Sequence, residues 1–170
     1  TRYGTVTGVQ TCALPIFNIM MSGTEDDMIN FISKCREEFK LLPPEQIAFP
    51  RTASDVRKYY SSSDIYAPKT PIQVRGALLF NHYIKEKKLT NKYSLINNGE
   101  KVKFIFLKKP NIIQENVISF IQQFPTELGL DKYIDYELQF EKAFLDPLKT
   151  IMNIIGWKEE KTVNLELFFT

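Results

Sequence analysis

The sequence predicts an α+β domain that is mostly helical and contains one small antiparallel sheet. Apolar residues recur at helical spacing in three long segments, 24–42, 70–89 and 131–156. Residues 101–108 follow a strand pattern that places Val102, Phe104 and Phe106 on one face, and a short strand-like run follows at 117–120. With 44% apolar and 25% charged residues, the 170-residue chain has the composition of a globular domain. No apolar run approaches the roughly 20 residues that a membrane span needs, so we expect no membrane partner.

The first sixteen residues do not resemble the start of a protein. They contain no initiator Met, and no basic region followed by a long apolar stretch, so a signal peptide does not explain them. Residues 6–16, VTGVQTCALPI, look like the in-frame translation of a sequencing-library adapter. We therefore expect residues 1–16 to be non-native and leave them out of the fold prediction. The alternative is a genuine strand-like leader.

The first native helix is predicted from Thr24 to about Leu42. Thr24 can cap the helix, and the three acidic residues after it suit the positive end of the helix dipole. The apolar stripe consists of Met28, Ile32, Cys35 and Phe39. Cys35 is interpreted as a core thiol, because no base lies near it in the sequence. The chain's two cysteines and single histidine cannot complete a four-ligand zinc site by themselves, and we expect a reducing compartment.

A mixed polar and aromatic segment follows the short apolar piece Gln46–Phe49. A helical turn is predicted from Ser54. The segment after it contributes cations, aromatic rings and hydroxyl groups, namely Arg57, Lys58, Tyr59, Tyr60 and Ser61–Ser63. Each of these groups can reach a phosphate or a sugar. A flexible polar loop is the alternative interpretation.

The segment Thr70–Leu89 predicts a helix with a buried side and a cationic strip. Thr70 is expected to be the N-cap, with Pro71 at the first helical position. One side of the helix carries Ile72, Gly76, Leu79, Phe80, Tyr83 and Ile84, and the other carries Arg75, Asn81, His82, Lys85 and Lys88. Long cationic side chains beside Asn and His suit phosphate oxygens. A solvated helix face is the alternative.

The best predicted strand is Lys101–Lys108. It follows a loop that turns at Asn97–Gly99, and its apolar face consists of Val102, Phe104 and Phe106. Lys101 and Lys103 are expected on the outer face together with Ile105. Val117–Phe120 is the expected partner strand.

The last third of the domain predicts two helices separated by a break at Pro147. Asp131 is expected to cap the first, with a stripe of Tyr133, Tyr136, Phe140, Ala143 and Phe144. Asp146 is expected to cap the second, whose stripe of Leu148, Ile151 and Ile155 ends before Gly156. Asp131 and Asp135 could also form a carboxylate pair for acid–base or metal chemistry, although helix capping explains them better.

The charges are distributed unevenly along the chain. Residues 51–110 contain thirteen Lys or Arg against four Asp or Glu, a net charge of +9, whereas the remainder carries nine against sixteen, a net charge of −7. A basic surface of this kind is typical of a protein that binds a polyanion. An acidic protein or a membrane surface would be attracted in the same way.

The tail, 158–170, begins with a polar segment that we expect to be flexible and ends with apolar residues. These are Leu165, Leu167, Phe168 and Phe169. They could pack on their own domain, but the Leu-x-x-Phe-Phe pattern is also typical of an anchor peptide that inserts into a groove of another protein.

From about Phe17 onward the chain resembles the C-terminal thumb of family B DNA polymerases of the T4-like tailed-phage type. The resemblance rests on four passages in the same order and spacing: IAFPRTASDVRKYY at 47–60, TPIQVRGALLFNHYIK at 70–85, KYIDYELQFEKAFLDPLK at 132–149, and the tail at 165–169. The most specific part is the core from Val74–Gly76 to Phe80–Asn81. It implies a thumb domain over residues 17–157 and a clamp-binding tail over 158–170.

The resemblance implies that the thumb wraps a primer–template duplex and holds it through the phosphate backbone. The implied DNA contacts are Arg75, Asn81, Lys85, Lys87 and Lys88, with Tyr59, Tyr60 and Ser61–Ser63 beside them. His82, Arg57, Lys58, Lys101 and Lys103 complete the predicted DNA-binding set. The tail would bind the sliding clamp through Leu165, Phe168 and Phe169, although its end, residues 165–170, carries fewer acidic residues than expected, with only Glu166.

The same resemblance places the chain beside the palm domain of its own polymerase, in a cytoplasmic phage replisome of a bacterial host. Nucleotidyl transfer in the full-length enzyme would use Mg²⁺ held by palm aspartates. The sequence contains no Asp-x-Asp motif on a predicted strand and no Gly-rich phosphate loop. We therefore expect this chain to bind DNA without a cofactor and without catalysing a reaction.

Two other functions remain open from the sequence. One is a basic protein-interaction domain that meets an acidic partner and is tethered by its Leu-x-x-Phe-Phe tail. The other is a nuclease or another small enzyme built around His82 and the acidic residues. The second is disfavoured, because His82 has no identifiable carboxylate that would orient it.

Overall fold

The structure is a computed structural model that describes residues 7–160. Its elements, in chain order, are the 3-10 turn Thr7–Cys12, α1 (Ala13–Ser22), α2 (Glu25–Lys40), α3 (Pro44–Ile47), β1 (Phe49–Ala53), α4 (Val56–Tyr59), β2 (Tyr60–Ser61), β3 (Ile65–Tyr66), α5 (Ile72–Glu86), β4 (Glu100–Phe106), β5 (Val117–Phe120), the 3-10 turns Thr126–Leu128 and Asp131–Tyr133, α6 (Tyr136–Phe140), the π-helical segment Glu141–Leu145, and α7 (Asp146–Ile154). The α+β class and the small antiparallel sheet are confirmed.

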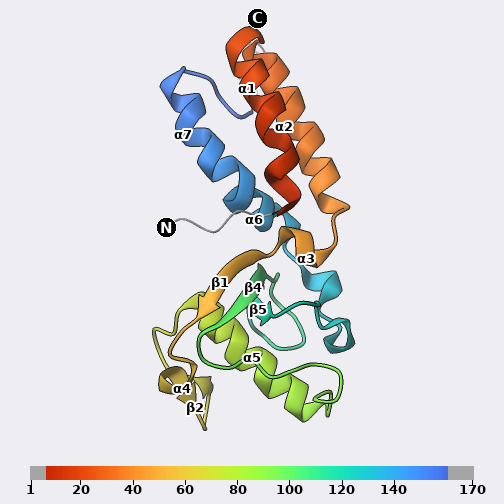
Figure 1. The fold of residues 1–170 in the computed structure, drawn as a ribbon. Helices are drawn as coiled ribbons and strands as arrows, with labels where there is room; N and C mark the ends of the chain where they lie inside the picture. Colours follow the sequence, from red (N-terminus) through yellow and green to blue (C-terminus); the bar gives the residue numbers. More distant parts are fainter. Residues whose placement is uncertain (1–6, 161–170) are drawn as a thin grey trace, which may run out of the picture.

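Helices α1, α2 and α7 and the sheet occupy opposite ends of the molecule (Figure 1). Figure 1 shows α1, α2 and α7 together at one end, and the sheet with α4 and α5 at the other. The short helices α3 and α6 lie between the two ends (Figure 1). One continuous cluster of buried side chains joins the two ends. It includes Met28 of α2 and Met152 of α7 at the helical end, and Phe104 and Ile118 in the sheet. The basic segment 51–110 therefore builds the sheet end.

The predicted start of α2 is confirmed in detail. Thr24 Oγ1 accepts a hydrogen bond from the Asp27 backbone N–H at 3.2 Å, and the Asp27 carboxylate accepts one from the Thr24 N–H at 2.8 Å. This reciprocal pair is a capping box, and its hydrogen bonds hold the pKa of Asp27 below its ordinary value. The four predicted stripe residues of α2 are all buried.

The segment before α2 is helical, which differs from the strand-like leader considered from the sequence. Thr7–Cys12 is a 3-10 turn, and α1 packs against α2. Cys12 Sγ lies 3.2 Å from Cys35 Sγ, and both thiols are free. Cys35 is buried as predicted, and this burial raises the pKa of its thiol, so the thiol stays protonated.

The main sheet has the order β1-β4-β5 and is antiparallel throughout. The predicted pairing of β4 with β5 is confirmed, with Ile105 opposite Ile118. Strand β1 was missed, because only its two end residues are buried and it contains Pro50. Proline lacks an N–H donor and is tolerated on an edge strand, which is where β1 lies.

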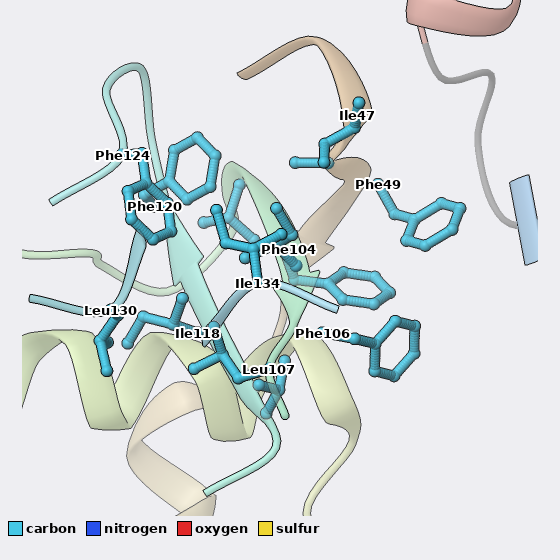
Figure 2. Packing of buried hydrophobic residues seen from close by; sticks show 14 of the residues in the cluster. Ile47, Phe49, Phe104, Phe106, Leu107, Ile118, Phe120, Phe124, Leu130 and Ile134 are labelled. Carbon is cyan, nitrogen blue, oxygen red and sulfur yellow. The ribbon is translucent and has the colours of Figure 1, made fainter. Parts of the chain in front are cut away.

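The prediction of an exposed face on β4 is wrong for Ile105. Lys101 is exposed and Lys103 half-buried, but Ile105 is fully buried, because both faces of β4 are covered from Phe104 onward. Figure 2 shows Phe49, Phe104 and Phe106 grouped on one side of the sheet; the centroid of the Phe104 ring lies 5.3 Å from that of Phe49 and 5.7 Å from that of Phe106.

Helix α5 begins one residue later than predicted, at Ile72 and not at Pro71. Thr70 does not cap it, since its hydroxyl donates to the Ala67 carbonyl at 2.6 Å. Pro71 is the N-cap, and its carbonyl accepts the first helical hydrogen bond from the Arg75 N–H at 2.8 Å. The helix packs mainly against β5, where Gly76 comes so close that a Cβ there would lie 2.8 Å from the Ser119 backbone nitrogen.

The helices after β5 differ from the prediction. Ile134 forms a β-bridge with Leu107, and this bridge keeps the chain extended where a helix was expected. Asp135 replaces Asp131 as the N-cap of α6, accepting from the Leu138 N–H at 3.1 Å. Asp146 is no cap either, because the chain passes through the π-helical segment into α7 without a break. Pro147 is tolerated in this position because it falls at the first turn of α7, just after the π-helical hydrogen bonds.

The buried stripe of α7 is also different from the predicted one. Leu148 is buried as expected, and Met152 joins it. Ile151 and Ile155 were expected in the core but are 46% and 43% exposed, and Ile154 is 80% exposed. The rest of the described chain covers Ile151 and Ile155 only in part and leaves Ile154 mostly open, so α7 presents an apolar surface. No described helix is long and apolar enough to cross a membrane.

Candidate nucleic-acid interface

The described part of the chain contains a cleft of about 720 Å³ between α4, the β2–β3 hairpin, α5 and the loop 95–98. We call it the α4–α5 cleft; Figure 1 shows these elements at the sheet end. Its apolar wall consists of Val56, Ile65, Leu78, Leu95 and Ile96. Its polar groups belong to Arg57, Tyr60, Asn81, His82, Lys85, Glu86, Asn97 and Asn98. Five of the predicted DNA-binding residues, from two separate passages of the sequence, therefore line one cleft.

Asn81 fixes the loop that forms one wall of the cleft. Its Nδ2 donates to the Ile96 carbonyl at 2.8 Å, and its Oδ1 accepts from the Ile96 N–H at 2.7 Å. The donor and the acceptor of the Asn81 side-chain amide are therefore both used in hydrogen bonds within the fold. A direct DNA contact by Asn81 stays a prediction, and this geometry makes Asn81 a residue that positions the cleft wall.

Asn98 joins the same loop to α4. Asp55, just before α4, has φ = +60° and offers no side-chain cap. The Asn98 Oδ1 instead accepts from the Val56 N–H at 3.1 Å, satisfying one of the free donors at the start of the helix. The neighbouring Gly99, with φ = +82°, donates its N–H to the Ala53 carbonyl at 2.7 Å. The loop that contains Asn98, which is distant from α4 in the sequence, therefore caps α4 and holds it beside α5.

The two cations of the cleft are available for a ligand. Arg57 and Lys85 are exposed, and neither makes a hydrogen bond or an ion pair with another described residue. His82 is placed differently, since its Nε2 lies 4.0 Å from a Glu86 carboxylate oxygen. Tyr60 is 62% exposed, so one aromatic ring stands at the cleft with most of its surface open.

Lys87 and Lys88 extend the cationic group beyond the end of α5. Both are exposed, and cations at this position are favoured by the negative end of the helix dipole. Lys88 has φ = +55°, and the Leu89 N–H donates to the Ile84 carbonyl at 2.9 Å. Together with the hydrogen bond from the Lys88 N–H to the Lys85 carbonyl at 3.0 Å, this is a Schellman motif. Lysine thus occupies the position where glycine is the usual residue.

Arg75 lies outside the cleft, in a network that ties α5 to the loop before β5. Its Nη2 donates to Asn116 Oδ1 at 2.7 Å, and its guanidinium lies 5.8 Å from the centre of the Tyr66 ring. Tyr66 in turn donates to Glu115. Burial and the Glu115 carboxylate raise the pKa of Tyr66, so it remains a hydrogen-bond donor. Arg75 was predicted as a phosphate contact, and the structure places its charge among these internal partners.

The remaining predicted residues lie on the sheet and beside the cleft. Lys101 is exposed on β4, and Lys103 donates to the Glu45 backbone carbonyl at 3.0 Å. Neither lines the cleft. Lys58, Tyr59 and Ser61 belong to α4 and β2, with the Lys58 ammonium 5.3 Å from the centre of the Tyr59 ring. The predicted clamp-binding residues, Leu165, Phe168 and Phe169, lie outside the described residues.

Sequence analysis missed the contribution of the loop 95–98. Asn97–Gly99 was interpreted only as a turn, which is correct, yet Asn97 and Asn98 also line the cleft. The local sequence holds no signal for this role, since the contact of Asn98 with α4 joins residues far apart in the chain. Among residues 7–160, no group of His, Cys, Asp and Glu is arranged to hold a metal ion.

The chain is similar in sequence to part of a known protein. No family model matches the sequence. The chain is 26% identical over 160 residues to the DNA-directed DNA polymerase of Enterobacteria phage T4. The matched region is 91% of this chain but only 17% of the phage enzyme, so the chain spans a small part of that protein. The chain is therefore a distant relative of one region of a phage DNA polymerase.

Proposed function

We propose that this chain is a fragment of a replicative family B DNA polymerase and forms its thumb, which grips primer–template duplex through the phosphate backbone. The observation that carries the proposal is that Arg57 and Lys85, which come from separate passages of the sequence, line one cleft and have no hydrogen-bond or ion-pair partner among the described residues. The similarity to a phage polymerase makes DNA the polyanion that fits this basic end best. The four matched passages noted in the sequence support the thumb assignment.

The proposed grip is electrostatic and independent of DNA sequence. Arg57, Lys85, Lys87 and Lys88 supply charges to phosphate oxygens, which position a duplex without reading its bases. Each phosphate that is neutralised releases condensed counterions. For each such phosphate, the logarithm of the binding constant should therefore fall by roughly 0.9 for every tenfold increase in salt concentration. Asn81 and Arg75 act indirectly in this proposal, by holding the walls from which these cations project.

The test is fluorescence anisotropy of the 170-residue chain with a labelled primer–template duplex across a salt series. Lys85→Ala should weaken binding by about fivefold on unrelated sequences, equivalent to roughly 1 kcal/mol, because a charged hydrogen bond to phosphate is lost. It should also lower the salt slope by about one.

The matched control is Lys34→Ala, which removes the same charge from α2 at the helical end, where the Lys34 side chain is 71% exposed. It should leave duplex binding unchanged. Equal losses in the two variants would show that only net charge matters, and a sequence-dependent loss in Lys85→Ala would contradict a backbone grip.

The further parts of the proposal concern the full-length enzyme. The tail would bind a sliding clamp through Leu165, Phe168 and Phe169, and the helical end would contact the palm of the same polymerase, in the cytoplasm of a phage-infected bacterium. Catalysis by the full-length enzyme would use Mg²⁺ held outside this chain. The exposed isoleucines of α7 fit the palm contact, because a protein rarely leaves three clustered large apolar side chains open to water.

The same apolar surface favours a second candidate, a protein-interaction domain with a basic face. In that case an acidic protein would occupy the sheet end, and duplex DNA would fail to displace it. Competition by duplex DNA therefore separates the two functions, whereas salt sensitivity alone does not, because both interactions are electrostatic.

A further inference from the structure

The α4–α5 cleft has features that a grip on duplex phosphates does not need. Phosphate oxygens on a duplex require cations and donors on an accessible surface, whereas this cleft is hollow and has an apolar wall of Val56, Ile65, Leu78, Leu95 and Ile96. Its volume of about 720 Å³ falls in the range of small-molecule sites. A ligand that uses the whole cleft must have a flat or apolar body as well as a negative charge.

We propose that the α4–α5 cleft binds a single unstacked nucleotide of the DNA that the chain holds. The base would lie against the apolar wall and the Tyr60 ring, while Arg57 and Lys85 would hold its phosphate. The inference rests on the proposed function in one respect, since the nucleotide belongs to the bound DNA. It adds a preference for single-stranded or unpaired nucleotides, which a backbone grip does not provide.

Tyr60 is the group that distinguishes a nucleotide from an isolated phosphate. Its ring is 62% exposed at the cleft, although exposing a large aromatic surface to water is unfavourable. Stacking a base on such a ring recovers this cost, and it tolerates any base because every base has a π-face. The ring is carried by β2, which pairs with β3, so it is presented from a hairpin.

The polar groups of the cleft match the edge of an unpaired base. The Asn98 Oδ1 is used by the Val56 N–H, but its amide nitrogen makes no hydrogen bond with another described residue. The Glu86 carboxylate lines the cleft beside His82 and can accept from an exocyclic amino group. An unpaired base exposes both acceptors and donors on its Watson–Crick edge, whereas a paired base uses them within the duplex.

The test compares two probes on the 170-residue chain. One is a short single strand that contains 2-aminopurine, whose fluorescence is quenched when it stacks, and the other is a blunt-ended duplex. Tyr60→Ala should weaken single-strand binding by about 5- to 150-fold, the range for loss of one stacked base, and should abolish the change in 2-aminopurine fluorescence. Duplex affinity should fall by a much smaller factor than single-strand affinity, because the proposed backbone grip depends on Arg57, Lys85, Lys87 and Lys88 and a paired base cannot stack on the ring. Tyr60→Phe is the matched control and should bind both probes like the parent, because it keeps the ring.

The outcomes separate this inference from the proposed function. If Tyr60→Ala binds the single strand as tightly as the parent, the proposed nucleotide site is wrong. The proposed duplex grip would still be supported if duplex affinity is salt-sensitive and falls in Lys85→Ala. If the parent binds the single strand through Tyr60 but does not bind the duplex, the grip is wrong and the nucleotide site stands. If neither DNA probe binds the folded chain, both are wrong and the cleft belongs to a protein partner.

Discussion

Asn81 is the residue on which the geometry of the cleft depends most directly. It was predicted as a DNA contact because it lies beside His82 and Lys85 on the cationic strip of the helix. The structure shows why an amide is needed there: only a side chain with both a donor and an acceptor can pair with the N–H and the carbonyl of Ile96 together. Ile96 is 2% exposed, so no water can replace these hydrogen bonds.

Replacing Asn81 with alanine should destabilise the domain and loosen the loop 95–98. Two buried backbone groups of Ile96 would lose their partners, and leaving such groups unpaired costs about 1–3 kcal/mol. Urea unfolding followed by circular dichroism measures this loss. Asn91→Ala, at an exposed turn position, is the control and should change the free energy of unfolding by less than about 0.5 kcal/mol. An Asn81→Ala variant as stable as the parent would show that the loop is held by its apolar contacts alone.

The elements were predicted best where local sequence and tertiary packing agree. Helix α2 has a capping box and a regular apolar stripe, and the structure confirms both. Strand β1 and the start of α6 were misjudged because pairing partners from elsewhere in the chain decide them. Phe49 pairs with Phe104, and Ile134 bridges to Leu107. Neither contact leaves a signal in the neighbouring sequence.

The end of α5 allows stability and DNA binding to be separated. Lys88 adopts φ = +55°, which costs an L-residue about 1–2 kcal/mol and costs glycine nothing. Lys88→Gly should therefore raise the free energy of unfolding by about 1 kcal/mol while weakening duplex binding, because the cation is lost. Thermal unfolding and fluorescence anisotropy on the same sample measure the two effects.

The matched variant is Lys87→Gly, which removes the same charge one residue earlier. Lys87 has φ = −84°, where glycine gains nothing and loses backbone entropy, so this variant should be destabilised by about 0.5–1 kcal/mol. Opposite changes in stability with similar losses of affinity would support the proposed cation role. A Lys88→Gly variant that binds duplex like the parent would remove Lys88 from the interface.

At the scale of the whole molecule, ion pairs join segments that are distant in the sequence. Glu137 of α6 pairs with Lys40 of α2 at 2.8 Å and with Arg36 at 3.2 Å. Glu127 accepts hydrogen bonds from Lys92 and from the Tyr93 hydroxyl, the latter at 2.5 Å. The Lys40 ammonium lowers the pKa of Glu137, and the Lys92 ammonium with Tyr93 lowers the pKa of Glu127 from 4.5 to about 2.

These lowered pKa values predict that acid destabilises the fold. Between about pH 4.5 and pH 2 the unfolded chain takes up a proton at Glu127 while the folded chain does not, so the free energy of unfolding falls as the pH falls. Glu127→Gln should lower the urea midpoint at pH 7 and have a progressively smaller effect as the pH approaches 2. An equal effect at pH 7 and pH 2 would show that Glu127 acts through its shape and not through its charge. Glu141→Gln controls for removal of one negative charge, because Glu141 is exposed and its carboxylate makes no hydrogen bond or ion pair with another described residue.

The sequence by itself determined the fold class, helices α2 and α5, the β4–β5 pair and the concentration of cations in residues 51–110. These follow from periodicity, capping residues and charge, which act over a few neighbouring residues and are therefore visible locally. Only the tertiary structure decided that Arg57, Tyr60 and Lys85 share one cleft and that Arg75 is held elsewhere by Asn116. It also decided that α7 exposes its isoleucines. The physical reason is that burial and hydrogen-bond partners depend on which distant segments pack together, and no local pattern encodes that choice.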